Sequence, residues 1–321
     1  MMKSRGGLKG NRVLVTGATG FVGANLARRL VAEAAEVIVL VRPGSDRWRL
    51  QSLPQPVRFE EGDLEDPDGI RQAVLKARPA VIFHCAFPGG HGSDEETVRR
   101  MLAAGVMGTY GLLSAAREAG VGKFIHIGSS TEYGFGPGAH RESDRLDPVS
   151  IRGVSKAASS LLCRQFGREH DLPVAILRLF TVYGPWESPG HLLPQACRAL
   201  LDGKPLEITP PGFVHDWIFV DDVVEACLAA AACEYPTGEV FNIGSGEQHT
   251  NEEVVETLAG IAGRKLELKV GRFSPRAIDS KSWLADVSNA REKLGWQPGH
   301  TLQAGLKETY EFWQGRHEKH N

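Results

Sequence analysis

The chain has 321 residues, of which 42% are hydrophobic and 24% are charged, and its formal net charge is -2. This length accommodates one large α/β domain and a smaller one. The near-neutral charge gives no support for a nucleic-acid partner or a membrane-surface partner. No apolar run approaches the roughly 20 residues that a transmembrane helix needs.

Two further features of the sequence bear on the cellular location of the protein. The five cysteines show no spacing typical of a metal site, so we expect reduced thiols, no metal and a cytoplasmic protein. The basic leader, residues 1–7, lacks the apolar core of a signal peptide.

Apolar strands alternate with helical patterns from residue 11 to about residue 180. The strand patterns fall at residues 12–16, 36–41, 81–86, 123–128 and 174–179. Continuous apolar runs joined by helices indicate a parallel sheet that is covered on both faces. We therefore predict an α/β fold with a doubly wound parallel sheet of the Rossmann type.

The pattern changes after residue 184, where prolines and glycines become frequent and helices shorten. A helix at 221–233 and a strand at 239–243 are expected to return to the sheet. We therefore predict a larger domain at 1–180, with about 215–246 returning to it. The smaller α/β domain is discontinuous and consists of 181–214 and 247–321.

Three glycines, Gly17, Gly20 and Gly23, follow the first strand and open the first helix. This spacing at the start of a βαβ unit is typical of a dinucleotide-binding turn. Gly17 permits the tight turn, Gly20 lets the backbone approach a pyrophosphate, and Gly23 lets helix and strand pack closely. The larger domain is thus predicted to bind a dinucleotide, and the contacts expected in the turn are Gly17, Thr19, Gly20, Phe21, Val22 and Gly23.

The end of the second strand indicates which dinucleotide is bound. Units that bind NAD tend to place an acidic residue there, which accepts a hydrogen bond from the ribose 2′-hydroxyl. Here the position is Val41, and Arg42 follows it. Because the geometry of a guanidinium matches that of a phosphate, Arg42 favours NADP over NAD. If Arg42 is instead only a solvated side chain, the site can still bind NAD.

Further motifs cover nearly the whole chain in a characteristic order. They include His84-Cys85-Ala86, Gly128-Ser129-Ser130-Thr131-Glu132-Tyr133-Gly134, Gly153-Val154-Ser155-Lys156, Val182-Tyr183-Gly184-Pro185 and Phe241-Asn242-Ile243-Gly244-Ser245-Gly246. With the glycine-rich turn, they resemble the extended short-chain dehydrogenase/reductase family, of the sugar-nucleotide epimerase/dehydratase type. The resemblance implies a nucleotide-diphosphate (NDP) sugar as the substrate partner. It also implies cofactor contacts from Asp63, Leu64, Ala86 and Lys156, with Asp63 at the adenine amino group.

The position four residues before Lys156 departs from the family. There the family normally has a tyrosine that acts as the proton shuttle, and this chain has Arg152. The resemblance implies that Lys156 binds the nicotinamide ribose and that Ser129 or Ser130 shares the hydrogen bond to the substrate. A guanidinium stays protonated at any working pH, so Arg152 cannot exchange a proton as tyrosine does.

Arg152 leaves three interpretations open. It stabilises an oxyanion while another group shuttles protons, it binds a substrate carboxylate or phosphate, or the protein has lost redox activity and only binds nucleotides. Substitute acid/base candidates are Glu132, Tyr133, His84 and His215, although Tyr133 and His84 are more readily explained as structural.

The substrate side is predicted from the same resemblance. Arg276 is the best candidate for the diphosphate, while Thr181 and His215 stand where the family commonly has asparagine and arginine. Two helices, at about 95–119 and 152–170, form the dimer contact in many relatives, so we expect a homodimer.

The leading hypothesis is an NAD(P)-dependent epimerase, dehydratase or 4-ketoreductase that acts on an NDP-sugar by hydride transfer with an atypical acid/base. The alternative is a non-catalytic protein that binds nucleotides or sugar nucleotides.

Overall fold

The computed structural model describes residues 8–318 except 52, 54–56, 90, 91, 93, 137 and 271–279. The basic leader and Arg276 lie outside the described residues. Within them, no helix combines the length and the apolar character that crossing a bilayer requires.

A seven-stranded sheet forms the centre of the larger part, and every neighbouring pair in it is parallel. In spatial order, its strands are β11 (Glu239–Ile243), β7 (Val174–Leu179), β5 (Lys123–Ser129), β4 (Val81–His84), β1 (Arg12–Thr16), β2 (Glu36–Val41) and β3 (Arg58–Glu61). Except for the edge strand β3, which is mostly charged, these strands form from largely apolar runs that are buried on both faces. The predicted doubly wound parallel sheet is confirmed.

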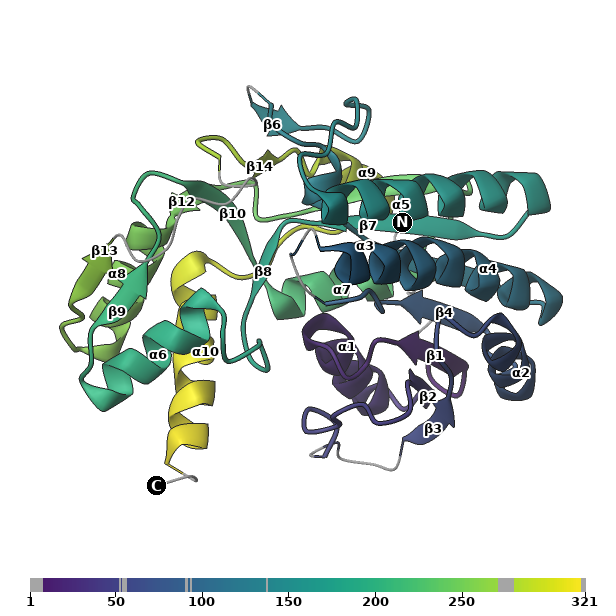
Figure 1. Cartoon of the computed structure of the whole chain (residues 1–321), viewed down its shortest axis with the longest axis horizontal. Coiled ribbons are helices and arrows are strands. Elements are labelled where there is room, and N and C mark those ends of the chain that lie inside the picture. Colours follow the sequence, from purple (N-terminus) through teal and green to yellow (C-terminus); the bar gives the residue numbers. More distant parts are fainter. Residues whose placement is uncertain are drawn as a thin grey trace.

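Helices cover both faces of this sheet (Figure 1). One face carries α2 (Pro67–Ala77), α3 (Glu95–Leu102), the π-helical turn η1 (Ala103–Met107), α4 (Gly108–Glu118) and α5 (Ile151–His170). The other face carries α1 (Phe21–Ala32) and α7 (Val220–Ala232), with α9 (Ser288–Leu294) beside β11. Each face has its own apolar core, so the sheet is the middle of three layers.

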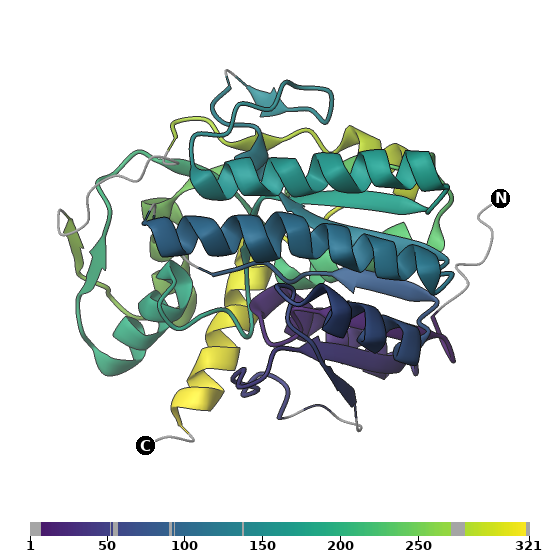
Figure 2. The same cartoon turned by 45° about the vertical axis from the view of Figure 1, so that its right-hand side comes forward.

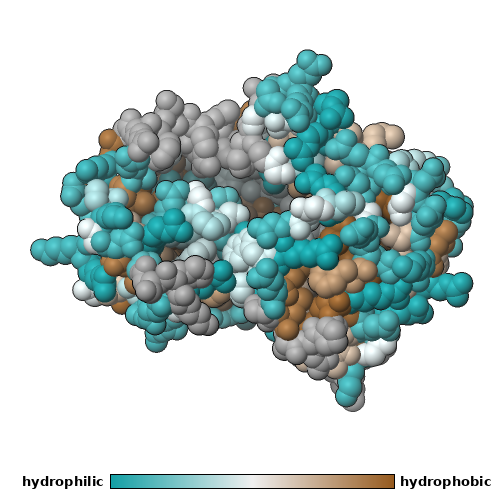
Figure 3. Space-filling view, turned by 60° about the horizontal axis from the view of Figure 1, so that its bottom comes forward, coloured by the Kyte–Doolittle hydropathy of each residue, from teal (hydrophilic) through white to brown (hydrophobic). Residues whose placement is uncertain are grey.

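A smaller part lies beside the sheet and has a third apolar core (Figure 2). Its helices are α6 (Leu192–Asp202), α8 (Asn251–Ala262) and α10 (Leu302–His317). Its strands are β8 (Thr181–Tyr183), β9 (Leu206–Ile208), β10 (Val214–Phe219), β12 (Gln248–Thr250) and β13 (Leu268–Val270). Figure 3 turns the lower side of Figure 1 toward the reader, and this face is largely hydrophilic with hydrophobic residues gathered in a few patches.

The segment at 215–246 is divided between the two parts. Strand β11 pairs with β7 at the edge of the large sheet and α7 packs on that sheet, whereas β10 pairs with β8 and β12. The short strands β6 (Ala139–His140) and β14 (Leu284–Ala285) form a further pair. The boundaries of the two proposed domains stay a prediction.

The strand order of the large sheet defines a switch point, which is where ligands bind in sheets of this kind. From β1 the chain first adds β2 and β3 on one side, and then β4, β5, β7 and β11 on the other. The carboxyl ends of β1 and β4 therefore flank the point where the order reverses. In open parallel sheets, ligands bind at this switch point.

Asp216 joins three segments of the chain. Its carboxylate is fully buried and accepts hydrogen bonds from the Ser245 N–H (2.6 Å), the Gly246 N–H (3.1 Å) and the Ala285 N–H (3.0 Å). Strand β10 is thereby fixed to the turn after β11 and to β14.

We predict that Asp216→Ala lowers the free energy of unfolding by about 3 kcal/mol, because it leaves buried N–H groups without an acceptor. Denaturant unfolding measures the loss. Glu256→Ala removes an exposed carboxylate of α8 and should change stability by less than about 0.5 kcal/mol. Equal losses in the two variants would contradict the role given to Asp216.

Candidate active site

The glycine-rich turn has the geometry that requires glycine. Gly17 follows β1 with a φ of 71°, in the left-handed region. A Cβ on Gly17 would lie 2.5 Å from the Ala86 backbone nitrogen, and a Cβ on Gly23 would clash with the Gly17 carbonyl oxygen. The turn therefore brings β1, α1 and the end of β4 closer together than any side chain would allow.

Helix α1 opens toward this turn without a protein cap. Its N-cap is Gly20, no side chain makes a capping hydrogen bond there, and the first turn contains no acidic residue. Phe21 and Val22 are its first two residues. Their backbone N–H groups and the helix dipole are therefore available to an anion, as a pyrophosphate requires.

A cavity of about 230 Å³ lies at the carboxyl ends of β1, β2, β3 and β4. It brings together seven of the predicted cofactor residues: Gly17, Thr19, Gly20, Arg42, Asp63, Leu64 and Ala86. Phe21, Val22, Gly23 and Lys156 are not among its lining residues. The uncapped helix, the close backbone approach and the lining residues fit a dinucleotide.

Lys156 is buried in α5 beside this cavity. Its Nζ donates a hydrogen bond to the Ile127 carbonyl oxygen at 2.7 Å and lies 4.3 Å from the centre of the Phe87 ring. Phe87 lines the cofactor cavity. Burial, and secondly the positive charge of Arg152, lower the pKa of Lys156 to about 8.

Arg152 lies in the first turn of α5, one turn before Lys156. Its Nη1 donates to the Pro88 carbonyl oxygen at 3.0 Å, and its guanidinium carbon lies 4.8 Å from the centre of the Phe87 ring. Burial lowers the pKa of Arg152. The two cations thus contact one aromatic ring at the edge of the cavity.

The two candidate serines differ in their surroundings. Ser129 is half-buried at the end of β5, and its Oγ lies 2.8 Å from the Thr131 Oγ1. Ser130 is buried in the short helix η2 (Ser130–Glu132), where its Oγ accepts a hydrogen bond from the Trp283 Nε1 at 3.0 Å.

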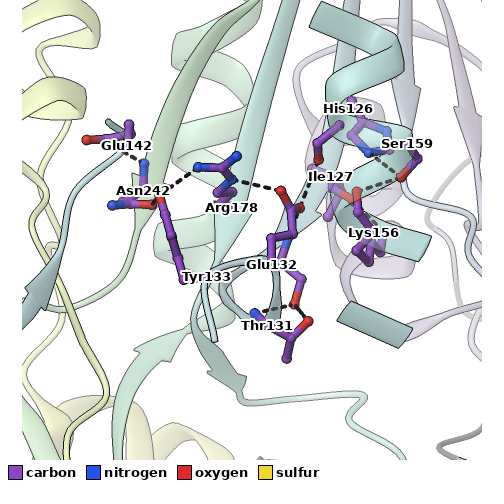
Figure 4. A network of polar contacts seen from close by, with 12 residues as sticks. His126, Ile127, Thr131, Glu132, Tyr133, Glu142, Lys156, Ser159, Arg178 and Asn242 are labelled. Carbon is purple, nitrogen blue, oxygen red and sulfur yellow. Dashed lines mark hydrogen bonds and ion pairs between the residues drawn. The ribbon is translucent and has the colours of Figure 1, made fainter. Parts of the chain in front are cut away.

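Glu132 has no exposed surface and is fully occupied by hydrogen bonds (Figure 4). Its Oε2 accepts from the Arg178 Nε at 2.8 Å. Its Oε1 accepts from the Ser129 N–H and from the Ser160 Oγ, both at 2.8 Å. The carboxylate therefore connects the end of β5 with α5 and β7.

The same network occupies Tyr133. Its hydroxyl accepts a hydrogen bond from the Arg178 Nη1 at 2.9 Å and donates one to the Asn242 Oδ1 at 2.6 Å (Figure 4). Burial raises the pKa of Tyr133 to about 12. A phenol held in this way does not exchange protons near neutral pH.

His84 lies at the end of β4, and both ring nitrogens have hydroxyl partners. Nδ1 lies 2.8 Å from the Thr16 Oγ1, and Nε2 lies 2.9 Å from the Thr109 Oγ1. Burial lowers the pKa of His84 to about 3, so the imidazole stays neutral in the working range.

Two of the predicted substrate residues, Thr181 and His215, are not among the residues that line the cofactor cavity. Thr181 in β8 is paired with Trp217 in β10, and His215 in β10 is paired with His249 in β12. Both residues belong to the small sheet. Among the described residues, no group of three His, Cys, Asp or Glu is placed to hold a metal ion.

Sequence reasoning missed Phe87 and Pro88. Both line the cavity, and they contact Arg152 and Lys156 as described above. The signal that could have found them is their place directly after the strand that ends at His84, since such loops carry ligand contacts in parallel sheets.

Similarity to known proteins extends over the same architecture. The family model of the NAD dependent epimerase/dehydratase family matches residues 13–244. A UDP-glucose 4-epimerase of Mycolicibacterium smegmatis is 32% identical over 95% of this chain and 99% of its own. A dTDP-glucose 4,6-dehydratase of Neisseria meningitidis is 28% identical over 94% of this chain and 93% of its own.

Two solved structures show the same fold. The UDP-glucose 4-epimerase of Thermotoga maritima with UDP-glucose has a TM-score of 0.85 and 29% identity, and the match covers 95% of this chain and 99% of that one. The UDP-glucuronic acid 4-epimerase of Bacillus cereus with UDP-glucuronic acid and NAD has a TM-score of 0.84 and 30% identity over the same shares. The chain therefore belongs to the NAD dependent epimerase/dehydratase family.

Proposed function

We propose that the protein is an NAD(P)-dependent enzyme that acts on an NDP-sugar by hydride transfer at the sugar, as an epimerase, dehydratase or 4-ketoreductase. One observation carries the proposal: the cavity that brings the predicted cofactor residues together is also lined by Phe87, which Lys156 and Arg152 both contact. The relatives named above act on UDP-sugars and dTDP-sugars, and they support this substrate class. When bound, the nicotinamide supplies the hydride acceptor or donor.

Different residues of the site are proposed to bind different parts of the cofactor and the substrate. The N-terminus of α1 and Gly17, Thr19 and Gly20 hold the pyrophosphate, while Asp63 and Leu64 meet the adenine end. Lys156, whose Nζ lies 4.3 Å from the centre of the Phe87 ring, is proposed to hold the nicotinamide ribose. On the substrate side we retain Thr181, His215 and Arg276 as contacts of the NDP-sugar.

Arg152 stands where the family's proton shuttle stands, and it fits the stabilisation of negative charge. A fixed guanidinium lowers the energy of an oxyanion that develops at the reacting sugar oxygen. Ser129 is the better serine for the hydrogen bond to that oxygen, because the Ser130 hydroxyl is buried against Trp283. The hydroxyl pair Ser129–Thr131 relays the proton of the sugar hydroxyl to solvent water, which accepts it, because both residues are only half-buried. Glu132, Tyr133 and His84 do not take this role, because each is held by other partners.

A second function is favoured by Arg152 itself. If no group replaces the tyrosine, the protein binds nucleotides without turnover. A panel of UDP-hexoses and dTDP-hexoses, incubated with NAD or NADP and analysed by mass spectrometry and NMR, separates the two functions. We expect one sugar nucleotide to be isomerised, dehydrated or reduced. Binding of a sugar nucleotide with no product in any incubation would overturn the enzymatic proposal and support the second function.

The pH dependence of cofactor binding tests the roles proposed for Lys156 and Arg152. With its pKa near 8, Lys156 is an ammonium donor below that pH and a neutral amine above it. We expect NAD affinity, measured by calorimetry, to fall as the pH rises through about 8. In Lys156→Gln this dependence should disappear. In Arg152→Leu the midpoint should move to higher pH, because a repelling charge is removed. A flat wild-type profile would contradict the assignment.

Arg42 decides between the two dinucleotides. Its exposed side chain lines the cavity beside Ser45, which supports contact with a 2′-phosphate, whereas the Bacillus cereus relative was solved with NAD. If NADP is the cofactor, Arg42→Ala should weaken NADP binding about tenfold and leave NAD binding unchanged. If Arg42 is only solvated, the two affinities will not change in the variant. Arg117→Ala, on the exposed surface of α4, is the control.

A homodimer is proposed from an exposed apolar surface. Helices α3 and α4 follow one another through η1 and lie beside α5 (Figure 1). Six large apolar residues on these elements are exposed: Leu102, Met107, Tyr110, Ile151, Val154 and Leu161. Met107 is 63% exposed. Such a surface is typical of a subunit interface.

All five cysteines are unpaired, which supports the cytoplasmic location proposed above.

We predict that the wild type sediments as a dimer and that Met107→Glu with Leu161→Glu sediments as a monomer, because charges are costly in a closed apolar interface. Val270→Glu, an exposed apolar residue of β13, should leave the dimer intact. A monomeric wild type would refute this interface.

A further inference from the structure

A second cavity, of about 430 Å³, lies between the two parts of the molecule. Trp48, from the connection after β2, forms one wall, and the ends of α6 and α10 form the other. The cavity has no lining residue in common with the cofactor cavity. Its volume is in the range that small-molecule sites have.

The polar residues of this cavity favour an anion. Arg198, Arg316 and His317 line it, and the only acidic residue among its lining residues is Asp202. The Asp202 carboxylate is already paired, with the His317 Nε2 at 2.8 Å and the Lys204 Nζ at 3.3 Å. The two guanidinium groups therefore dominate the charge that a ligand meets.

Arginines behind the cavity add to this positive charge. Burial is the largest cause that lowers the pKa of Arg28 and of Arg49, and the charge of Arg316 lowers both further, whereas Asp46 acts on Arg49 in the opposite direction. Arg49 is buried and donates to the carbonyl oxygens of Trp186 (2.7 Å) and Thr19 (3.0 Å). Because guanidinium groups at close range repel one another, a bound anion would lower the energy of this arrangement.

The apolar residues of the cavity favour a flat ring. The indoles of Trp48 and Trp313 both line it, together with Leu201 and Pro189. The Trp48 ring packs against the Trp186 ring, and their centres are 5.6 Å apart. The Arg316 guanidinium carbon lies 4.9 Å from the centre of the Trp48 ring, so an anion bound by Arg316 lies next to an indole. Indoles also stack on aromatic rings, which favours a ligand that carries a ring beside its anionic group.

The backbone next to the cavity is strained. Trp186 has a φ of 69°, in the region that glycine favours, and Arg49 holds its carbonyl oxygen. The Arg28 guanidinium lies 3.7 Å from the centre of the Trp186 ring. Strained backbone that is held by several contacts is common at ligand sites. Trp186 is thus fixed as a support for the wall that Trp48 forms.

We propose that this cavity is a second ligand site, which binds a nucleoside diphosphate. The base stacks on the indoles of Trp48 and Trp313, and the diphosphate pairs with Arg198 and Arg316. The ligand contacts residues from both parts of the molecule, so its binding favours one arrangement of the two.

The test uses ADP as the probe and the whole chain. Equilibrium dialysis with radiolabelled ADP is carried out without and with saturating NAD and NADP, which compete for the cofactor cavity. We expect a fraction of bound ADP that neither dinucleotide displaces. Arg316→Ala and Arg198→Ala should each weaken that fraction about tenfold, while the displaceable fraction and NAD binding stay unchanged. Arg117→Ala should have no effect. Arg198 is exposed, so its variant keeps the folded structure if Arg316→Ala does not.

Three results would overturn the proposal. Complete displacement of ADP by NAD or NADP would show that the cofactor cavity alone binds it. A fraction that is not displaced but is unchanged in both variants would place ADP elsewhere. Equal competition by inorganic pyrophosphate would show that the base is not recognised. None of these results depends on whether the protein turns over an NDP-sugar.

Discussion

The arrangement of the candidate site depends on the buried ion pair between Glu132 and Arg178. Both side chains are almost inaccessible to solvent, at 0% and 4% exposure. Two charges at such depth are stable only when their remaining hydrogen-bonding groups have partners, and here the Ser129 N–H, the Ser160 hydroxyl and the Tyr133 hydroxyl supply them. The pair therefore fixes the end of β5, helix α5 and strand β7 relative to one another. Because α5 carries Lys156 and Arg152, the pair also fixes both cations.

Cofactor binding and proton transfer depend on different features of the site. Cofactor binding depends on backbone geometry, on glycines that allow close approach and on an uncapped helix, and all three are present. Proton transfer depends on one side chain, and we propose that a permanent cation, Arg152, takes the place of the family's titratable phenol there. Glu132 and Tyr133 lie near in sequence to Ser129 but are committed to the network, so they do not restore a shuttle. The proposed account assigns charge stabilisation to Arg152 and the hydrogen bond to Ser129.

Much of this could be predicted from the sequence, for physical reasons. Residues 12–16, 36–41, 174–179 and 239–243 were predicted as strands with the observed bounds, since fully buried strands need uninterrupted apolar runs. The turn at Gly17 was recognisable because only glycine permits both its φ and its closeness to Ala86. Strand β3 was missed because it lies at the edge of the sheet and three of its four residues are charged.

The surroundings of the site residues could not be predicted. The partners of Glu132 and Tyr133 include Arg178 and Asn242, which are far away in sequence. No local pattern indicates such a pairing, so Glu132 was taken as a possible acid/base and Phe87 was not considered. The same holds for Trp48 and Arg316, which approach each other only in the folded chain.

The central claim is that the site transfers hydride with Arg152 in place of tyrosine. The most direct measurement is the near-ultraviolet absorbance of reduced nicotinamide after rapid mixing of the NAD-loaded protein with each sugar nucleotide in turn. The account predicts that reduced cofactor forms with one of them, and that Arg152→Leu slows this step at least about 100-fold, because the oxyanion loses its fixed cation. No reduced cofactor with any sugar nucleotide, or an equal rate in Arg152→Leu, would contradict the account.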